Sequence, residues 1–402
     1  MSGSIHAARG HRSLVILPDN GRVLLRQELA LAFTSLGFMV IRPRPEELDD
    51  PGSPHYLPRL LDQKPSLFFS VNLEGILGIR QAGRLILSAG IPVLAWFVDN
   101  PWHILSGARD PSWKELTLAV TDHSFVAALE AAGATKVLHL PLAAGFTPPP
   151  KAAPPPRLAG LRGIVFAGRT AFPGREEFFR GQKAPEELLE QARTSMDRGF
   201  KTAEERPDFA WWMRRLCLED PAVFWPGKKA RLPGLGAAMC NAWWRVACLT
   251  AVCGGQGGLT LFGDAGWREE LLPALSGRGL EAALDLRGPL DYYDDLPLLY
   301  QGADFSLNLN SLLLPAGLSQ RIYDVWAAGG FCLTDWNPGL TLFPEELTRE
   351  VTFHAPGELP ELAARLRADP SRREKLRREW QAEIQSRHNY TVRLGELLER
   401  ST

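Results

Sequence analysis

The chain has 402 residues, enough for two domains, with 45% hydrophobic and 23% charged residues, as in an ordinary globular protein. Lys and Arg (45) balance Asp and Glu (46), so no overall positive field favours nucleic acid, and we predict no nucleic-acid partner. Five cysteines without a C-x-x-C pair argue against a disulfide framework or a zinc site and fit a reducing cytoplasm. No segment approaches the roughly 20 apolar residues of a membrane span, and the first apolar run is too short for a signal peptide. We therefore expect a cytoplasmic protein without a transmembrane segment.

Short apolar runs alternate with helical patterns through the first part of the chain. The runs are residues 13–19, 38–41, 66–72, 92–100, 116–122 and 136–143. Helical patterns cover 23–37, ending on Gly37, and 124–133, with Ser124 as a candidate N-cap. Strands that are apolar throughout are typical of a parallel sheet covered by helices on both faces. Residues 1–146 are therefore predicted to form a doubly wound α/β domain.

The same alternation restarts after a proline-rich segment. Residues 147–160 contain six prolines and read as a stiff, extended linker. The later runs are residues 163–169, 259–264, 283–288, 304–310, 331–336 and 351–356. We predict a second doubly wound domain over 161–370, followed by a charged helical stretch at 371–402. Open α/β folds bind ligands outside the carboxyl ends of their strands, so a cleft between the two halves is the expected site.

A helical insertion interrupts the second half at about residues 171–250. About three helical segments are expected there, with five of the twelve tryptophans and a basic patch at 228–231. The tryptophans fit the core of a dry helical subdomain. They also fit a surface for a lipid-linked or polymeric acceptor. The sequence does not separate these two interpretations.

Several familiar nucleotide and metal motifs do not occur in the sequence. There is no G-x-x-x-x-G-K-[ST], no G-x-G-x-x-G after a strand, no D-x-D pair and no H-E-x-x-H. We predict no metal site and no cofactor. A nucleotide-diphosphate site would then have to neutralise its phosphates with helix N-termini, backbone N–H groups and arginines.

Two segments of the second half fit a phosphate and ribose site. Gly168 and Arg169 follow the run 163–167, where glycine lets a phosphate approach and arginine can bind it. A helix beginning near Ser319 and Gln320 would aim its first amides at the same edge. One turn further, Arg321 and Asp324 share a face, and Asp324 could accept hydrogen bonds from ribose hydroxyls. The alternative is a solvated ion pair between these two side chains.

Candidate acceptor-side residues lie in the first half. Asp99 ends the run 92–98, and His103 follows shortly after it. Asp99 could contact an acceptor hydroxyl or, if the enzyme inverts, act as general base, with His103 as the second candidate base. The structural alternative for Asp99 is a helix N-cap or turn residue before Pro101. The loop Asp19–Gly21, after the first strand, is also predicted to lie on the acceptor side.

One stretch in particular resembles a known family. Residues 319–336, SQRIYDVWAAGGFCLTDW, resemble the R-x-x-E/D-x-x-A-x-G-G segment of the CgeB-like glycosyltransferases, the spore-maturation type related to the retaining glycosyltransferase family one. Weaker matches are GIVFAGR (163–169), LFGDAGW (261–267), LAWFVDNPW (94–102), VLHLPLAAGF (137–146) and HNYTVRLGELL (388–398). The resemblance covers most of the chain except the insertion at 171–240.

The resemblance implies the GT-B architecture of two Rossmann-like domains, with a nucleotide sugar bound mostly by the second and the final helix packed back on the first. It makes Asp324 the ribose-binding acid, Arg321 the arginine beside it and Arg169 a diphosphate contact. It implies a retaining hexosyltransferase that needs no metal and acts on a glycan, lipid-linked or protein acceptor. Such an enzyme could also contact a membrane surface peripherally. The sequence departs from the pattern at Ala316, where the broader families have an acid. The lysine after the phosphate-binding arginine is missing too, and Arg175 is the nearest substitute.

Two other functions fit the same fold. A nucleotide-sugar epimerase or hydrolase would need acid and base side chains in the cleft and would turn over its donor without an acceptor. A non-catalytic nucleotide-sugar-binding protein would bind the donor without turnover, which the alanine at 316 favours slightly.

Overall fold

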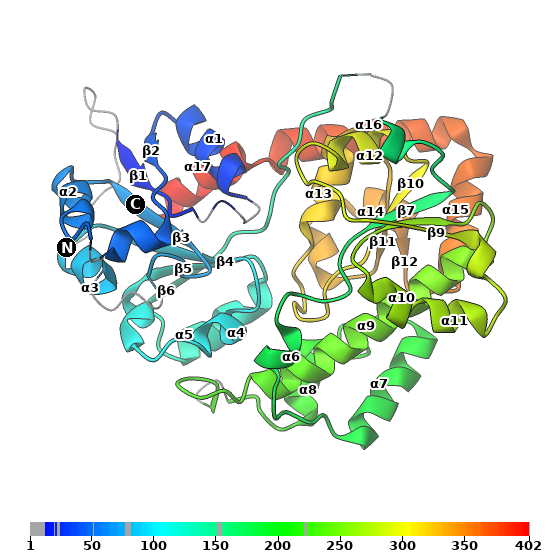
Figure 1. Cartoon of the computed structure of the whole chain (residues 1–402), viewed down its shortest axis with the longest axis horizontal. Helices are drawn as coiled ribbons and strands as arrows, with labels where there is room; N and C mark the ends of the chain where they lie inside the picture. The colour runs from blue at the N-terminus through cyan, green and yellow to red at the C-terminus, as the bar shows by residue number, and fades with distance from the viewer. Residues whose placement is uncertain are drawn as a thin grey trace. The chain divides into compact units, whose positions relative to one another are not determined.

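The computed structural model describes residues 13–19, 21, 25–50, 52–76, 82–150, 155–220 and 223–401. The chain divides into two compact units, and each is described by itself (Figure 1). The first unit comprises Met1–Gly145, Asp220–Ala230 and Arg387–Thr402. The second unit comprises Phe146–Glu219 and Arg231–Ser386.

The first unit contains a six-stranded parallel sheet in the order β2-β1-β3-β4-β5-β6. Its strands are β1 Leu14–Ile16, β2 Met39–Ile41, β3 Leu67–Val71, β4 Val93–Phe97, β5 Thr117–Val120 and β6 Lys136–His139. The strands β1, β3 and β4 are buried along their whole length. Apolar side chains on both faces of these strands are the reason that the sequence showed continuous apolar runs. All six predicted strands of this half are confirmed.

Helices accompany this sheet in the first unit. They are α1 Arg26–Ser35, α2 Tyr56–Asp62, α3 Ala82–Ser88, α4 Pro101–Leu105, α5 Val126–Ala131 and the C-terminal α17 Tyr390–Ser401, with short 3-10 turns between them. The N-cap predicted at Ser124 is wrong. Asp122 accepts a hydrogen bond from the Ser124 amide at 2.9 Å and caps a 3-10 turn, and α5 starts two residues after Ser124. The helix α17 packs against α1 of the same unit.

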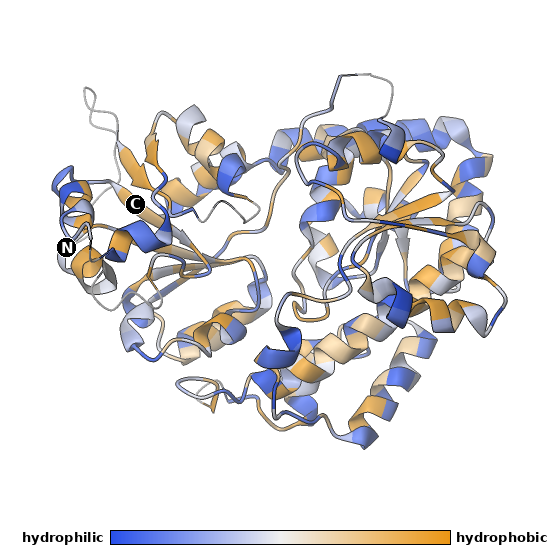
Figure 2. Ribbon diagram, in the orientation of Figure 1, coloured by the Kyte–Doolittle hydropathy of each residue, from blue (hydrophilic) through white to orange (hydrophobic). Residues whose placement is uncertain are grey.

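The second unit contains another six-stranded parallel sheet, in the order β12-β11-β10-β7-β8-β9. Its strands are β7 Ile164–Ala167, β8 Leu259–Phe262, β9 Leu284–Arg287, β10 Phe305–Asn308, β11 Cys332–Asp335 and β12 Thr352–Phe353. Each predicted run of this half contains one of these strands. The α/β class with two doubly wound sheets is therefore confirmed, and Figure 2 shows apolar strands in the interior of each unit.

The described part of the insertion region contains four α-helices rather than about three. They are α6 Arg175–Phe178, α7 Glu186–Arg198, α8 Phe209–Arg215 and α9 Arg231–Gly254. Three of its tryptophans, Trp211, Trp212 and Trp244, are buried, as expected for a subdomain core. The other helices of the second unit are α10 Gly266–Glu270, α11 Leu272–Ser276, α12 Leu296–Gly302, α13 Gln320–Ala327, α14 Glu345–Val351, α15 Glu358–Ala368 and α16 Pro370–Arg387.

The division of the chain differs from the predicted boundaries in two places. Asp220–Ala230, predicted as part of the insertion, belongs to the first unit, where Trp225 packs edge-on against Trp113 at 5.6 Å. Residues 371–386, predicted to lie on the first domain, belong to the second unit, where the rings of Trp380 and Trp326 stack at 5.1 Å. Contacts between residues far apart in sequence, these aromatic pairs among them, place both segments, and such contacts leave no local sequence pattern.

The described part of the predicted linker is tied to the second unit. Arg157 forms an ion pair with the buried Asp295, and Arg287 donates hydrogen bonds to the carbonyls of Arg157 and Ala159 at 3.0 and 2.9 Å. None of the helices that the structure describes has both the length and the hydropathy needed to cross a membrane.

Candidate functional site

The carboxyl edge of the second sheet gathers most of the predicted donor-binding residues. The strands β7, β10 and β11 are adjacent and parallel, so their carboxyl ends meet at one edge. Gly168 and Arg169 follow β7, and the helix α13 begins at Gln320 after the loop that leaves β10. The predicted start of the helix near Ser319 is confirmed, because Ser319 is its N-cap residue.

Arg321 and Gly168 are brought into contact at this edge. The guanidinium of Arg321 donates a hydrogen bond to the carbonyl of Ala167 and lies over the Phe166 ring, 4.8 Å from its centroid. A side chain at Gly168 would place its Cβ 3.1 Å from an Arg321 nitrogen. The alternative of an ion pair between Arg321 and Asp324 is wrong, because Arg321 is directed at the end of β7 instead.

Two further arginines lie at the same edge of the sheet as Arg321. Arg169 is exposed, and its side chain has no hydrogen-bond or ion-pair partner among the described residues. Arg245 of α9 donates from Nη1 to the Arg169 carbonyl at 3.0 Å, while its buried Nε has no hydrogen-bond partner in the described part of the chain. Burial, together with the nearby charge of Arg321, lowers the pKa of Arg245 to about 10, so it remains charged at neutral pH. Three arginines therefore lie at this edge of the sheet, and the charged groups of Arg245 and Arg321 are close enough to repel each other.

Sequence reasoning missed Arg245. The residue lies in a long, largely apolar helix, far in sequence from Gly168 and Arg321, and no motif spacing marks it. The one sequence feature that could have indicated it is a single arginine in an apolar stretch, directly after Trp244, which the structure shows to be buried.

A buried polar network supports the loop between β10 and α13. Asn308 and Asn310 share hydrogen bonds with Thr334, and Asn310 donates from its backbone and side-chain nitrogens to the Asp335 carboxylate, both at 2.8 Å. Ser319 occupies the N-cap position of α13, but its side chain makes no capping hydrogen bond. Its hydroxyl donates to the Asn308 side chain instead. Burial raises the pKa of Asp335, although hydrogen bonds from Asn310 and Trp244 and the charge of Arg206 oppose that shift. The network fixes where α13 begins.

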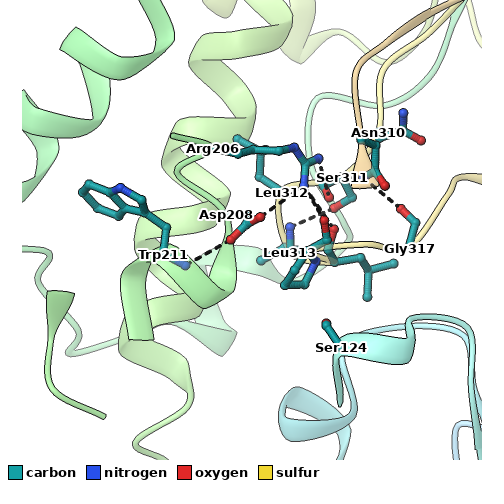
Figure 3. Close-up of polar contacts among 12 residues, drawn as sticks. Ser124, Arg206, Asp208, Trp211, Asn310, Ser311, Leu312, Leu313 and Gly317 are labelled. Carbon is teal, nitrogen blue, oxygen red and sulfur yellow. Dashed lines mark hydrogen bonds and ion pairs between the residues drawn. The ribbon is translucent and has the colours of Figure 1, made fainter. Parts of the chain in front are cut away.

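Arg206 holds the same loop from the other side (Figure 3). It is fully buried and pairs with Asp208 at 3.3 Å. Its guanidinium also donates to the carbonyls of Pro315 at 2.9 Å and Ser311 at 3.4 Å. The backbone N–H of Phe209 donates to the carbonyl of Leu312 at 2.8 Å. The segment 206–209 thus sets the path of the chain before α13, another contribution that sequence reasoning missed.

Asp324 lies deeper than a freely accessible ribose-binding acid. It is 1% exposed. The Tyr292 hydroxyl donates to its Oδ2 at 2.6 Å, and Gln320 Nε2 donates to its Oδ1 at 3.0 Å. Ribose hydroxyls could bind this carboxylate by replacing one of these two donors. Gln320, which was predicted as a donor contact, therefore also orients Asp324.

Replacing Asp324 with alanine should lower both stability and nucleotide affinity. The change removes the carboxylate that accepts from the half-buried Tyr292 hydroxyl and Gln320 amide, and the loss of these charge-assisted hydrogen bonds costs roughly 1–3 kcal/mol of unfolding free energy. If ribose replaces a donor, the nucleoside affinity should fall as well. Denaturant unfolding and calorimetric titration of the variant measure the two effects separately. A variant that loses stability but binds nucleoside diphosphate like the wild type would contradict the ribose assignment.

The first unit places Asp99 at the carboxyl end of β4. Its side chain is exposed, and Asn72 donates from Nδ2 to its Oδ2 at 2.8 Å. The helix-cap alternative for Asp99 is wrong, because the N-cap of α4 is Asn100, whose side chain accepts from the Trp102 amide at 3.0 Å. Asn72 has φ 53°, an unusual left-handed conformation for a residue other than glycine. Strained backbone beside a polar pair is a common feature of functional sites.

The remaining first-unit candidates are less accessible. His103 lies in the short helix α4 and is half-buried. Asp19 is largely buried, forms an ion pair with Arg42 and accepts from the Gly21 amide at 2.8 Å. These contacts engage the Asp19 carboxylate. Asn20, the middle residue of the predicted segment Asp19–Gly21, lies outside the described residues.

Comparison with known proteins agrees with this architecture. Residues 245–399 match the model of a family described as glycosyl transferase-like. A comparison with curated protein sequences finds no significant match.

Several solved structures share the fold at low sequence identity. The Anabaena protein Alr3699/HepE, crystallised with UDP and glucose, is 11% identical, with a TM-score of 0.56 over 97% of this chain and 99% of its own. A glycosyltransferase from Rickettsia africae is 10% identical, with a TM-score of 0.52 over 97% and 98%. The T4 phage protein BGT, crystallised with UDP-glucose, is 9% identical, with a TM-score of 0.52 over 97% and 99%. The chain has the GT-B fold of two Rossmann-like domains.

Proposed function

We propose that the protein is a glycosyltransferase that moves a hexosyl group from a nucleotide-diphosphate donor to a glycan, lipid-linked or protein acceptor. The observation that carries this proposal is the cluster of Arg169, Arg245 and Arg321 at the carboxyl edge of the second sheet. None of the three forms an ion pair within the described residues, and the charges of Arg245 and Arg321 oppose one another. Such a cluster favours a polyanion, and a diphosphate supplies one.

The family match and the shared fold support the same activity. The match begins at Arg245 and includes α13, so it contains two of the three arginines. The HepE crystal structure contains UDP and glucose, and the BGT structure contains UDP-glucose. UDP-sugars are therefore the first donors to test, and UDP is the first nucleotide. We propose that the chain is CgeB-like because of the segment 319–336, and that it acts in the cytoplasm.

The chemistry that we propose is stabilisation of the leaving diphosphate. Cleaving the bond between sugar and phosphate builds negative charge on the departing oxygen. Preorganised donors that meet such charge are each worth about 10²–10³ in rate. Three arginines and the N-terminus of α13 would supply this stabilisation without a metal ion, so we propose metal-independent transfer. In a retaining reaction the departing phosphate itself can help to deprotonate the acceptor hydroxyl.

Replacing Asp99 with asparagine tests the acceptor side of the proposal. An asparagine at 99 keeps an oxygen that can accept the Asn72 hydrogen bond but cannot take a proton. Donor affinity and melting temperature should therefore stay close to those of the wild type. Transfer should fall by about 10²–10⁴ if Asp99 is a general base. Transfer at the wild-type rate, with the variant folded, would assign Asp99 a structural role alone.

A further inference from the structure

A large cavity runs along α9 in the second unit, and Glu270 of its lining lies near Arg245 of the cluster of Arg169, Arg245 and Arg321. Its volume is about 1060 Å³. Its walls are α7, the α10–α11 segment and the turn after β12 at residues 355–357. We call it the α9 groove. Figure 1 shows α7 and α9 as neighbouring helices, and they are in contact.

The floor of the groove is apolar. Met239, Trp243, Val246 and Thr250 line it and recur along α9 at intervals of three and four residues, so they share one face of the helix. Ala247, beside them, is exposed, and Trp243 and Val246 are partly exposed. Figure 2 shows that α9 is largely apolar. A helix face of this kind would ordinarily be covered or would carry polar side chains.

The rim of the groove is positively charged. Arg193 of α7 and Arg278, just after α11, are exposed lining residues, and neither side chain forms an ion pair or hydrogen bond within the described part of the chain. The Arg193 guanidinium lies over the Trp243 ring, 4.1 Å from its centroid. Arg175 is a third arginine of the lining, against two acids, Asp197 and Glu270. The rim therefore has an excess of unpaired positive charge above an apolar floor.

A polar group without a partner lies at the floor as well. The Thr250 hydroxyl is buried and has no hydrogen-bond partner among the described residues. A helical threonine usually satisfies its hydroxyl with the carbonyl one turn earlier. An unsatisfied hydroxyl in an otherwise apolar floor favours a ligand that brings a polar atom of its own.

We propose that the α9 groove binds a single-chain anionic amphiphile, a lipid phosphate, with its apolar chain along α9 and its head group at Arg193 and Arg278. Arginine is the side chain best suited to bind phosphate through paired hydrogen bonds. The volume slightly exceeds the roughly 300–1,000 Å³ of small-molecule sites, which leaves room for a chain-bearing ligand. A stable protein partner would need a contact surface of about 800 Å² on each side, and the groove is concave rather than flat. The proposal goes beyond the donor site and does not depend on glycosyl transfer.

The test is calorimetric titration of the full-length protein with three probes. Dodecyl phosphate, kept below its micelle concentration, carries both chain and charge, whereas dodecyl maltoside carries the chain alone and inorganic phosphate the charge alone. We expect one dodecyl phosphate to bind per chain, at least about tenfold more tightly than either other probe. Ala247→Trp, at an exposed position, should fill the groove and weaken binding by at least about tenfold. Ala251→Trp offers a second block if the first variant fails to fold.

The charged rim is tested by an arginine pair and a matched control. Arg193→Gln with Arg278→Gln should remove the preference for dodecyl phosphate over dodecyl maltoside. Arg198→Gln, an exposed arginine of the same helix outside the groove, should not. Absence of binding, or equal binding by the blocked and wild-type proteins, would overturn the proposal. So would inorganic phosphate binding as tightly as dodecyl phosphate, or a wild-type dimer that the blocking variant dissociates.

Discussion

Replacing Arg245 with methionine is expected to weaken the binding of UDP by about 10–100-fold, the equivalent of one charged hydrogen bond of roughly 1.5–3 kcal/mol. Binding of uridine should change little, because a nucleoside lacks the phosphates that the guanidinium would meet. The same pattern is expected for Arg169→Met. Calorimetric titration of both ligands into each variant measures the difference directly.

Two controls separate phosphate binding from support of the loop. Arg245→Lys keeps the charge and should recover part of the UDP affinity, although lysine cannot reproduce the paired geometry of arginine. Arg268→Met removes an exposed arginine of α10 and should have no effect. If Arg245→Met weakened uridine and UDP equally, Arg245 would act only by holding the Arg169 carbonyl, to which it donates at 3.0 Å.

The largest loss of stability is expected from Arg206→Met. Arg206 is fully buried against Asp208, and removing one partner of a buried ion pair typically costs about 3–5 kcal/mol. The variant also loses the hydrogen bonds to Pro315 and Ser311, so the loop before α13 should become looser and donor affinity should fall. Denaturant unfolding and UDP titration report these two consequences.

A double variant shows which part of that loss comes from the stranded charge. Asp208→Asn removes the negative charge and keeps an oxygen that can accept the Trp211 amide, now bonded at 3.0 Å. Combined with Arg206→Met it should recover part of the stability but not the donor affinity, because the loop contacts stay lost. Arg214→Met, an exposed arginine of α8, is the matched control. Wild-type stability in Arg206→Met would contradict this account of the loop.

The sheets could be predicted from the sequence because buried parallel strands are apolar along their whole length. The strand β11, for example, is buried at all four positions and lies within a predicted run. Gly168 and Arg169 could be proposed as site residues because they follow a strand directly, and the carboxyl ends of parallel strands are where such folds bind ligands. Arg321 could be proposed from its place in the first turn of the following helix.

The rest depends on packing between distant segments. Arg245 reaches the site from the middle of α9, and Arg206 reaches the loop before α13 from more than 100 residues away along the chain. Tyr292, which covers Asp324, precedes it by 32 residues in a segment without a motif. Asp220–Ala230 joins the first unit through Phe224 and Trp225, which contact Trp102 and Trp113. Sequence periodicity reports local structure and carries no information on such pairs.

The central claim is that the second unit binds a nucleoside diphosphate at the cluster of Arg169, Arg245 and Arg321. Thermal unfolding with a panel of nucleosides, nucleoside diphosphates and their sugars tests it most directly. A ligand at 100 times its dissociation constant stabilises the protein by about 2.7 kcal/mol. We expect UDP or another nucleoside diphosphate, and its sugars, to raise the melting temperature of the wild type, the matching nucleoside to do so much less, and the Arg169→Met/Arg245→Met variant to show no shift. A panel in which no nucleoside diphosphate shifts the wild type, or one in which the double variant shifts equally, would contradict the claim.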